Sequence, residues 1–169
     1  AEHDEMASAI LITTSSELAN KVSAEIDGFL KELSRSEIIS KSLDNYGYIL
    51  LVDDINEAVS VANDIASEHL EIVTKDPFNV MTKIKNAGEI LLGDYTPVTL
   101  CNFVLGPNAI LPTGGFAKTY SSVSVQDFLK RSSVGYASKD GFENVRDYAY
   151  RFAKVEGFDT HGLAVKERK

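Results

Sequence analysis

The sequence has no tryptophan, two methionines and one cysteine, Cys101, among 169 residues. A single cysteine excludes an internal disulfide framework, so we expect Cys101 to be a small buried apolar side chain. The absence of disulfides suits a reducing compartment, and we expect the protein to lie in the cytoplasm. No apolar run approaches the length of a membrane span, and the acidic first residues do not resemble a signal peptide. Basic residues are also few, and the net charge of −8 makes nucleic acid an unfavourable partner.

Several catalytic and phosphate-binding motifs are also missing. No two of the 11 glycines are separated by a single residue, so the G-x-G-x-x-G dinucleotide motif is absent. The phosphate-binding G-x-x-x-x-G-K-[ST] loop and the G-x-S-x-G elbow of serine hydrolases are absent too. The stretch P-T-G-G at 112–115 is only a weak anion-binding signal.

The first half of the chain alternates apolar strands with amphipathic helices. Helices are expected after the capping-box spacing Thr14–Glu17, after Asp54, and after Asp76-Pro77. Continuous apolar strands separated by such helices are typical of a mostly parallel sheet covered by helices. The four expected strands are Ala9–Thr13, Tyr48–Val52, Leu70–Val73 and Gly88–Leu92.

The pattern changes after the fourth strand. Residues 93–116 are rich in glycine and proline, which is typical of a functional excursion. A short helix at Ser124–Arg131, a short strand at Ser133–Ala137 and a long helix at Asp140–Glu156 are expected next, before a polar end. We therefore predict the α/β class, with a Rossmann-like half (1–116), a mostly parallel sheet flanked by helices, and a C-terminal helical extension (117–169) that mediates dimerisation.

Three histidines are the main candidates for chemistry. His69 lies fourteen residues after Ile55, which the helical pattern places at the end of a buried helix face, and Glu68 lies beside it. The pair could supply a general base and a second acid–base group. The ordinary alternative is a satisfied core histidine beside a solvated carboxylate. His3 and His161 lie at opposite ends of the chain without close metal-ligand spacing, and on spacing alone they are exposed terminal residues.

Six segments fall in the order and spacing seen in histidinol dehydrogenases. They are A-E-H-D at the start, S-E-H-L-E-I (67–72), N-A-G-E-I-L-L-G-D-Y-T-P (86–97), G-P-N-A-I-L-P-T-G-G (106–115), S-V-Q-D-F-L-K-R (124–131) and E-G-F-D-T-H-G-L-A-V (156–165). Over its whole length the sequence resembles the C-terminal part of that family. The resemblance implies a zinc- and NAD-dependent oxidation of L-histidinol to L-histidine through an aldehyde, by an intertwined homodimer.

The resemblance also implies roles for individual residues. His69 would take the substrate hydroxyl proton, and Glu68 would activate the water that hydrates the aldehyde. His3 and His161 would be zinc ligands, with His161 reaching in from the other subunit. Glu156 would contact the substrate amine. All three histidines of the chain thus match functional family positions, which favours the functional interpretation of His69.

The sequence departs from the family at other site positions. Asn102 replaces an aspartate zinc ligand, Phe103 a neighbouring tyrosine, and Ala109 a substrate-binding histidine. A glutamine ligand would precede Ala1. A neutral amide serves zinc less well than a carboxylate, so zinc should bind weakly or not at all.

The family's NAD domain has no counterpart in this sequence. We therefore expect a truncated or degenerate relative that does not bind NAD and is inactive by itself. The alternatives are a noncatalytic dimerising or small-molecule binding module that reuses this half-fold and, less favoured, a non-redox zinc hydrolase.

Overall fold

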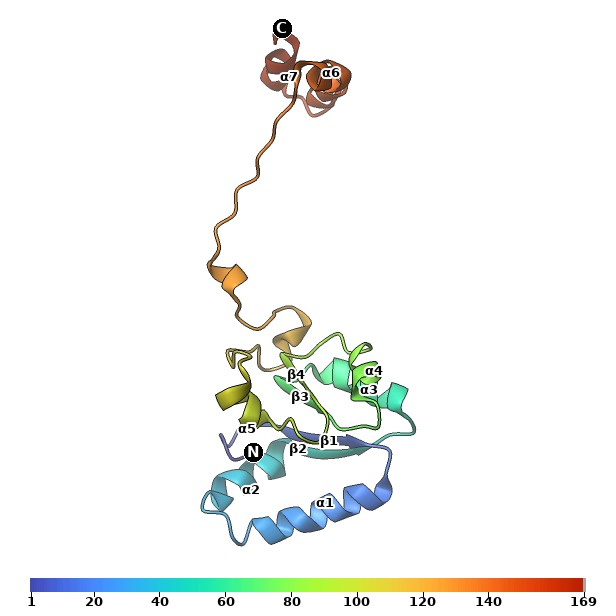
Figure 1. The fold of residues 1–169 in the computed structure, drawn as a ribbon, viewed down its shortest axis with the longest axis vertical. Helices are drawn as coiled ribbons and strands as arrows, with labels where there is room; N and C mark the ends of the chain where they lie inside the picture. The colour runs from blue at the N-terminus through green and yellow to red at the C-terminus, as the bar shows by residue number, and fades with distance from the viewer. Residues whose placement is uncertain (169) are drawn as a thin grey trace. The chain divides into compact units, whose positions relative to one another are not determined.

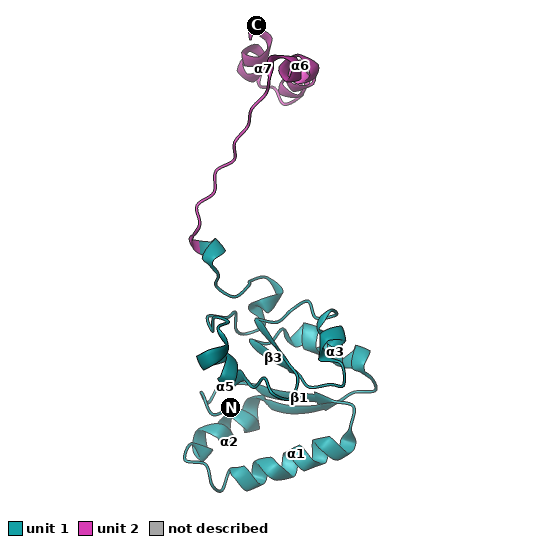
Figure 2. Ribbon diagram, in the orientation of Figure 1, with its two compact units in different colours: residues 1–127 teal, residues 128–169 magenta. Residues whose placement is uncertain are grey.

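The computed structural model describes residues 1–168. It divides into two compact units, Ala1–Asp127 and Phe128–Lys169 (Figure 2). The domain boundary expected between residues 116 and 117 is drawn from composition and stays a prediction. Within residues 1–168, no helix combines the length and the apolar character needed to cross a membrane.

Two pairs of parallel strands form the centre of the first unit. Strand β1 (Ala9–Thr13) pairs with β2 (Gly47–Leu51), and β3 (His69–Ile72) pairs with β4 (Glu89–Leu92). The α/β class with parallel pairing is confirmed. The described strands form two separate two-stranded sheets rather than one continuous sheet. Helices α1 and α2 lie on one side of the β1–β2 pair, and β3 and β4 lie on the other (Figure 1).

The helices of this unit begin at residues with capping side chains. Helix α1 (Ser16–Phe29) is capped by Ser15, one residue after the predicted Thr14. Helices α3 (Ile55–Ile65) and α4 (Pro77–Met81) begin after Asp54 and Asp76, as predicted. The Asp54 side chain accepts hydrogen bonds from two backbone N–H groups of the first turn, and the Asp76 side chain accepts one. A further helix, α2 (Ser36–Tyr46), is not predicted by the sequence analysis.

The predicted place of His69 at the end of a helix is wrong. Helix α3 ends at Ile65 because Ala66 adopts the left-handed conformation, with a φ of 52°, and is fully buried. The chain turns there, and His69 becomes the first residue of β3. Its side chain therefore follows the geometry of a strand rather than the face of a helix.

The glycine- and proline-rich segment contains only short helical turns. Helix α5 (Val98–Leu100) leads directly into a π-helical turn η1 (Cys101–Leu105), which ends at Gly106 in the left-handed region. A 3-10 turn, η2, follows at Phe116–Lys118. The helix predicted at Ser124–Arg131 is reduced to the single 3-10 turn η3 (Val125–Phe128).

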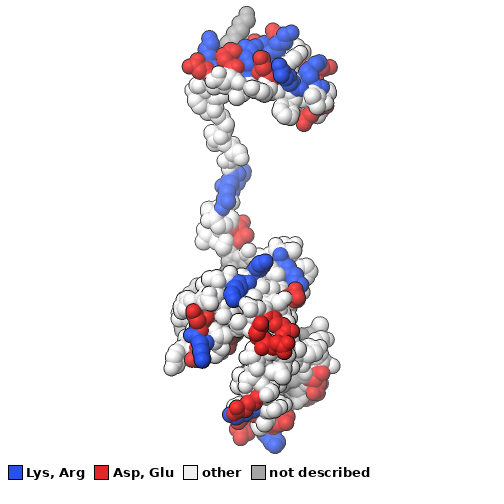
Figure 3. All heavy atoms as spheres, turned by 90° about the vertical axis from the view of Figure 1, so that its right-hand side faces the viewer, with Lys and Arg blue, Asp and Glu red and all other residues white. Residues whose placement is uncertain are grey.

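The second unit is a pair of helices, α6 (Lys139–Val155) and α7 (Asp159–Lys166). The long helix is confirmed, and the polar end of the chain, for which no element is named in the sequence analysis, contains α7. The strand predicted at Ser133–Ala137 is wrong: these residues are exposed and contain no regular element, because no strand in the described part of the unit pairs with them. Charged side chains gather along one edge of the helical pair at the top of Figure 3, and the opposite edge is mostly white, with few charged side chains.

Candidate active site

The first residues of β3 and β4 form a polar pair in the first unit. His69 and Glu89 stand directly opposite each other in the parallel register. The His69 Nδ1 atom lies 2.8 Å from Glu89 Oε2, and the two side chains are 22% and 8% exposed. Glu68 lies on the other side of the ring, with Oε1 3.7 Å from His69 Nε2 and 43% of its side chain exposed. The imidazole is thus held between a buried and an accessible carboxylate.

Backbone contacts fix the entry to these strands. The Gly88 N–H donates to the Ser67 carbonyl over 2.9 Å, and the Glu89 N–H donates to the Glu68 carbonyl over 2.8 Å. A Cβ atom at Gly88 would lie 2.6 Å from the Glu68 oxygen, a distance that real Cβ atoms do not show. Only glycine therefore permits this close approach of the two chains.

Asn63, in helix α3, holds the loop that leads into β4. Its side-chain oxygen accepts hydrogen bonds from the backbone N–H groups of Lys85 and Asn86, over 2.6 and 3.1 Å. The Asn86 side chain donates back to the Asn63 carbonyl over 3.0 Å. These three bonds tie the loop to a helix, so the position of Glu89 is set by rigid elements.

Cys101 links the glycine- and proline-rich segment to the His69–Glu89 pair. It is 4% exposed, and burial together with the negative charges of Glu89 and Glu71 raises the pKa of its thiol. Glu71 also accepts a hydrogen bond from the Val98 N–H over 3.0 Å, which anchors the start of α5. The next residue after the cysteine, Asn102, is exposed on η1.

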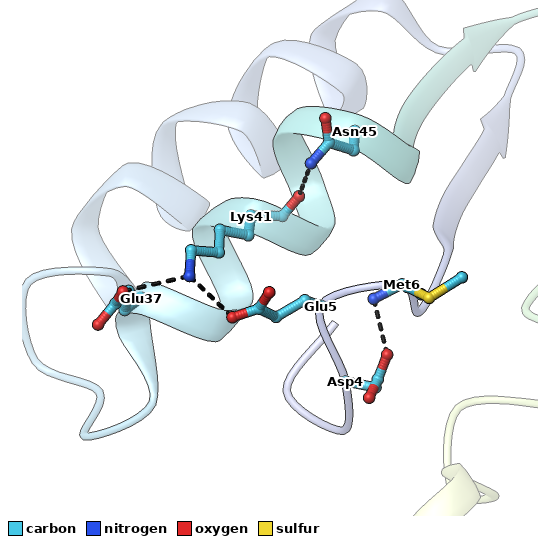
Figure 4. A network of polar contacts seen from close by, with 6 residues as sticks. All are labelled: Asp4, Glu5, Met6, Glu37, Lys41 and Asn45. Atoms are coloured by element: carbon cyan, nitrogen blue, oxygen red, sulfur yellow. Dashed lines mark hydrogen bonds and ion pairs between the residues drawn. The ribbon is translucent and has the colours of Figure 1, made fainter.

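The segment that carries His3 is anchored to helix α2 (Figure 4). The Lys41 ammonium lies 2.8 Å from Glu5 and 3.2 Å from Glu37, and hydrogen bonds to both carboxylates raise the pKa of Lys41. The buried Ser42 hydroxyl donates to the Ala7 carbonyl over 2.7 Å. Arg35, just before α2, donates through Nε to the Glu2 carbonyl over 3.0 Å.

Glu156 and His161 belong to the second unit. Both are exposed, and both line an open hollow between α6 and α7. The His161 ring lies against Phe158, with ring centroids 5.1 Å apart. An ion pair between Lys154 and Asp159 joins the two helices at their connection and lowers the pKa of Asp159.

The predicted site residues are therefore brought together only in part. Glu68 lies beside His69, and Glu156 shares a hollow with His161, whereas His3 and Asn102 lie on separate elements. Within residues 1–168, no three His, Cys, Asp or Glu side chains group closely enough to hold a metal ion. The roles of all six residues stay predictions.

Glu89 is the member of the site that the sequence analysis missed. One signal could have revealed it: Glu89 lies at the start of the next predicted strand, and the parallel register of the two strands places it opposite His69. The misplacement of His69 on a helix concealed that pairing.

Comparison with known proteins gives one consistent result. A family model described as histidinol dehydrogenase matches residues 1–169. The histidinol dehydrogenase of Aquifex aeolicus is 52% identical over 169 residues, which is 100% of this chain and 40% of that protein. A histidinol dehydrogenase homolog of Colwellia psychrerythraea is 47% identical over 98% of this chain and 38% of its own length. The crystal structure of the Elizabethkingia anophelis histidinol dehydrogenase superposes with a TM-score of 0.93 at 30% identity, covering 98% of this chain and 38% of that chain. The chain thus spans about 40% of the length of the relatives it matches.

Proposed function

The chain belongs to the histidinol dehydrogenase family, and from this premise we propose that it carries the acid–base part of an NAD-dependent alcohol dehydrogenase active site. The family is one of oxidoreductases of histidine biosynthesis, and L-histidinol is the substrate that the resemblance implies. The observation that carries the proposal is the placement of His69, which is held at Nδ1 by buried Glu89 and has Glu68 beside Nε2.

His69 and Glu68 each suit one proton transfer. Oxidising an alcohol removes a proton from its oxygen and a hydride from its carbon, and NAD accepts the hydride when it is bound. His69 Nε2 takes the hydroxyl proton, because an imidazole is a base near neutral pH. Glu68 is the more exposed carboxylate, so water reaches it, and it removes a proton from the water that hydrates the aldehyde.

Zinc and NAD belong to the family as a whole. In this chain His3 and His161 are the imidazole donors, and Asn102 offers only a neutral oxygen. The placement of His69 between Glu89 and Glu68 supports assigning the proton transfers to His69 and Glu68. We propose that the isolated chain binds zinc weakly, does not bind NAD and does not turn over. A micromolar dissociation constant for NAD, measured by calorimetric titration, would contradict this.

We also propose that the chain acts as a homodimer in the cytoplasm. Helix α6 exposes large apolar side chains: Val145 is 54% exposed, Phe152 70% and Val155 85%. Such a surface favours association. In a dimer, His161 of one subunit would meet His3 of the partner. Sedimentation at about 10–50 micromolar, a range suited to a modest interface, should show a dimer, and a strict monomer would rule out the shared site.

The activity is best tested in a chimera. We would replace the matching 40% of the Aquifex aeolicus enzyme with this chain. Asn102→Asp and Ala109→His would then restore two of the three positions at which this chain departs from the family, the zinc ligand and the substrate-binding histidine. NAD-dependent oxidation of L-histidinol should rise from the plain chimera to the restored one. In the restored chimera, His69→Gln and Glu68→Gln should each lower kcat by at least about 100-fold, the usual contribution of an acid–base group.

A matched control separates catalysis from folding. Glu25→Gln changes an exposed carboxylate on α1 and should leave kcat unchanged. A folded, dimeric restored chimera without turnover would contradict the dehydrogenase proposal. It would favour the alternative, a noncatalytic dimerising or small-molecule binding module, which Asn102, Ala109 and the incomplete donor set support.

A further inference from the structure

Glu89 is placed by the pairing of β3 with β4. It is paired in register with His69, and its N–H donates to the Glu68 carbonyl over 2.8 Å. Its side chain is 8% exposed, against 43% for Glu68. The two carboxylates beside the imidazole therefore differ in kind: one is shielded and fixed by strand pairing, and the other is open to solvent.

A buried carboxylate requires a hydrogen-bond donor, because an unpaired one loses the hydration that it had in the unfolded chain. The Glu89 carboxylate lies 2.8 Å from His69 Nδ1, and the Cys101 thiol is its other side-chain hydrogen-bond partner. An ionised carboxylate only accepts, so Nδ1 carries the hydrogen. In a neutral imidazole the other nitrogen, Nε2, then has the lone pair.

The nitrogen with the free lone pair, His69 Nε2, lies on the side of the ring where the accessible carboxylate, Glu68, is found. His69 Nε2 lies 3.7 Å from Glu68 Oε1, which is longer than a hydrogen bond. Nε2 is therefore not already occupied by Glu68 and can accept a proton from a third group. The fixed charge of Glu89 would also stabilise the imidazolium that forms.

We propose that Glu89 is a positioning residue that holds the Nδ1–H tautomer of His69 and thereby makes Nε2 the proton-accepting nitrogen of the site. This inference rests on the proposed function of His69 as a base. Sequence comparison alone does not supply it, because the assignment depends on the distance and burial of the two carboxylates.

Ring-nitrogen NMR on the full chain tests the tautomer without any turnover. With three histidines in the chain, the His69 signals are identified by their loss in His69→Gln. In wild type, long-range nitrogen–proton correlations at a pH where the ring is neutral should show Nδ1 protonated and Nε2 unprotonated. Glu89→Ala should shift His69 toward the Nε2–H tautomer, whereas the exposed Glu25→Gln control should not change it. An Nε2–H tautomer in wild type, or no change in Glu89→Ala, would overturn the proposal.

Turnover in the restored chimera tests the consequence for catalysis. Glu89→Gln keeps the shape and one acceptor oxygen but removes the charge, so we expect kcat to fall at least about tenfold with KM within about twofold. Wild-type turnover in Glu89→Gln, with His69→Gln inactive, would refute the positioning role. Wild-type turnover in both variants would instead contradict the proposed function of His69. If Glu89→Ala fails to fold, the turnover of Glu89→Gln in the restored chimera still decides the question.

Discussion

Replacing Gly88 by alanine should disturb the candidate site by displacing its backbone. The new Cβ would lie 2.6 Å from the Glu68 carbonyl oxygen and 3.2 Å from Pro112 Cδ. The φ of Gly88 is not in the left-handed region, so the cost comes from lack of space. To reach even 3.0 Å, the Glu68 backbone must move by about 0.4 Å. That carbonyl accepts the hydrogen bond from Glu89, so the shift acts directly on the His69–Glu89 pair.

The expected size follows from two opposing effects. Overpacking of this kind costs about 1–3 kcal/mol, and the reduced freedom of the unfolded chain returns about 0.4–1 kcal/mol. We therefore expect Gly88→Ala to lower the free energy of unfolding by about 1–2 kcal/mol, measured by urea denaturation. It should also change the tautomer signal of His69. The displacement is too small to unfold the unit, because the rest of the β3–β4 ladder is untouched.

Gly28→Ala is the matched control. Gly28 lies in α1, and nothing lies within 4 Å of an added Cβ. Alanine is the better helix former, so this variant should gain up to about 1 kcal/mol. Equal or greater stability of Gly88→Ala relative to wild type, with unchanged His69 signals, would refute the view that this close approach positions the site.

Three further predictions concern the parts that carry the other histidines. Ser42→Ala removes the buried hydrogen bond to the N-terminal segment and should lower the free energy of unfolding by about 0.5–1.5 kcal/mol in urea; an unchanged value would show that this bond does not anchor the segment. Lys154 lowers the pKa of Asp159, so their pair stabilises the α6–α7 unit above the unfolded pKa of about 3.9, and that contribution is lost as pH falls through the folded pKa. On acidification, wild type should therefore lose part of its helical circular dichroism at the lowest pH, and Asp159→Asn should not show this last loss. Superimposable acid titrations of wild type and Asp159→Asn would disprove this. Asn102→Asp should tighten zinc binding in competition with a chromophoric chelator, and His3→Ala should weaken it; tight binding by wild type would show that Asn102 is not a lost ligand.

The sequence predicts the regular elements best where local signals agree. The four strands are each found within a residue or two of their predicted bounds, since short apolar runs lie between strong capping residues. Asp54 and Asp76 predict their helices because a side-chain cap acts within three residues. Local chemistry is sufficient at these points because it does not depend on distant contacts.

The errors occur where distant contacts decide the structure. Helix α2 has no side-chain cap and is held by contacts to the chain's first residues, such as Ser42 with Ala7. The stretch Ser133–Ala137 has the residues of a strand but no neighbour to pair with in the described part of its unit. A strand needs a partner for its backbone groups, so its own sequence cannot establish it.

The candidate site shows the same division between local and distant information. The sequence alone identifies Glu68 and His69 as chemically interesting neighbours, and the resemblance assigns them roles. Which nitrogen of His69 is free depends on Glu89, a residue 20 positions away that strand register brings within 2.8 Å. A one-residue slip of that register would turn the Glu89 side chain to the opposite face of the sheet. The acid–base property of the site is thus set by the pairing of β3 with β4. For this reason the chemistry also depends on Gly88, which has no reactive group of its own.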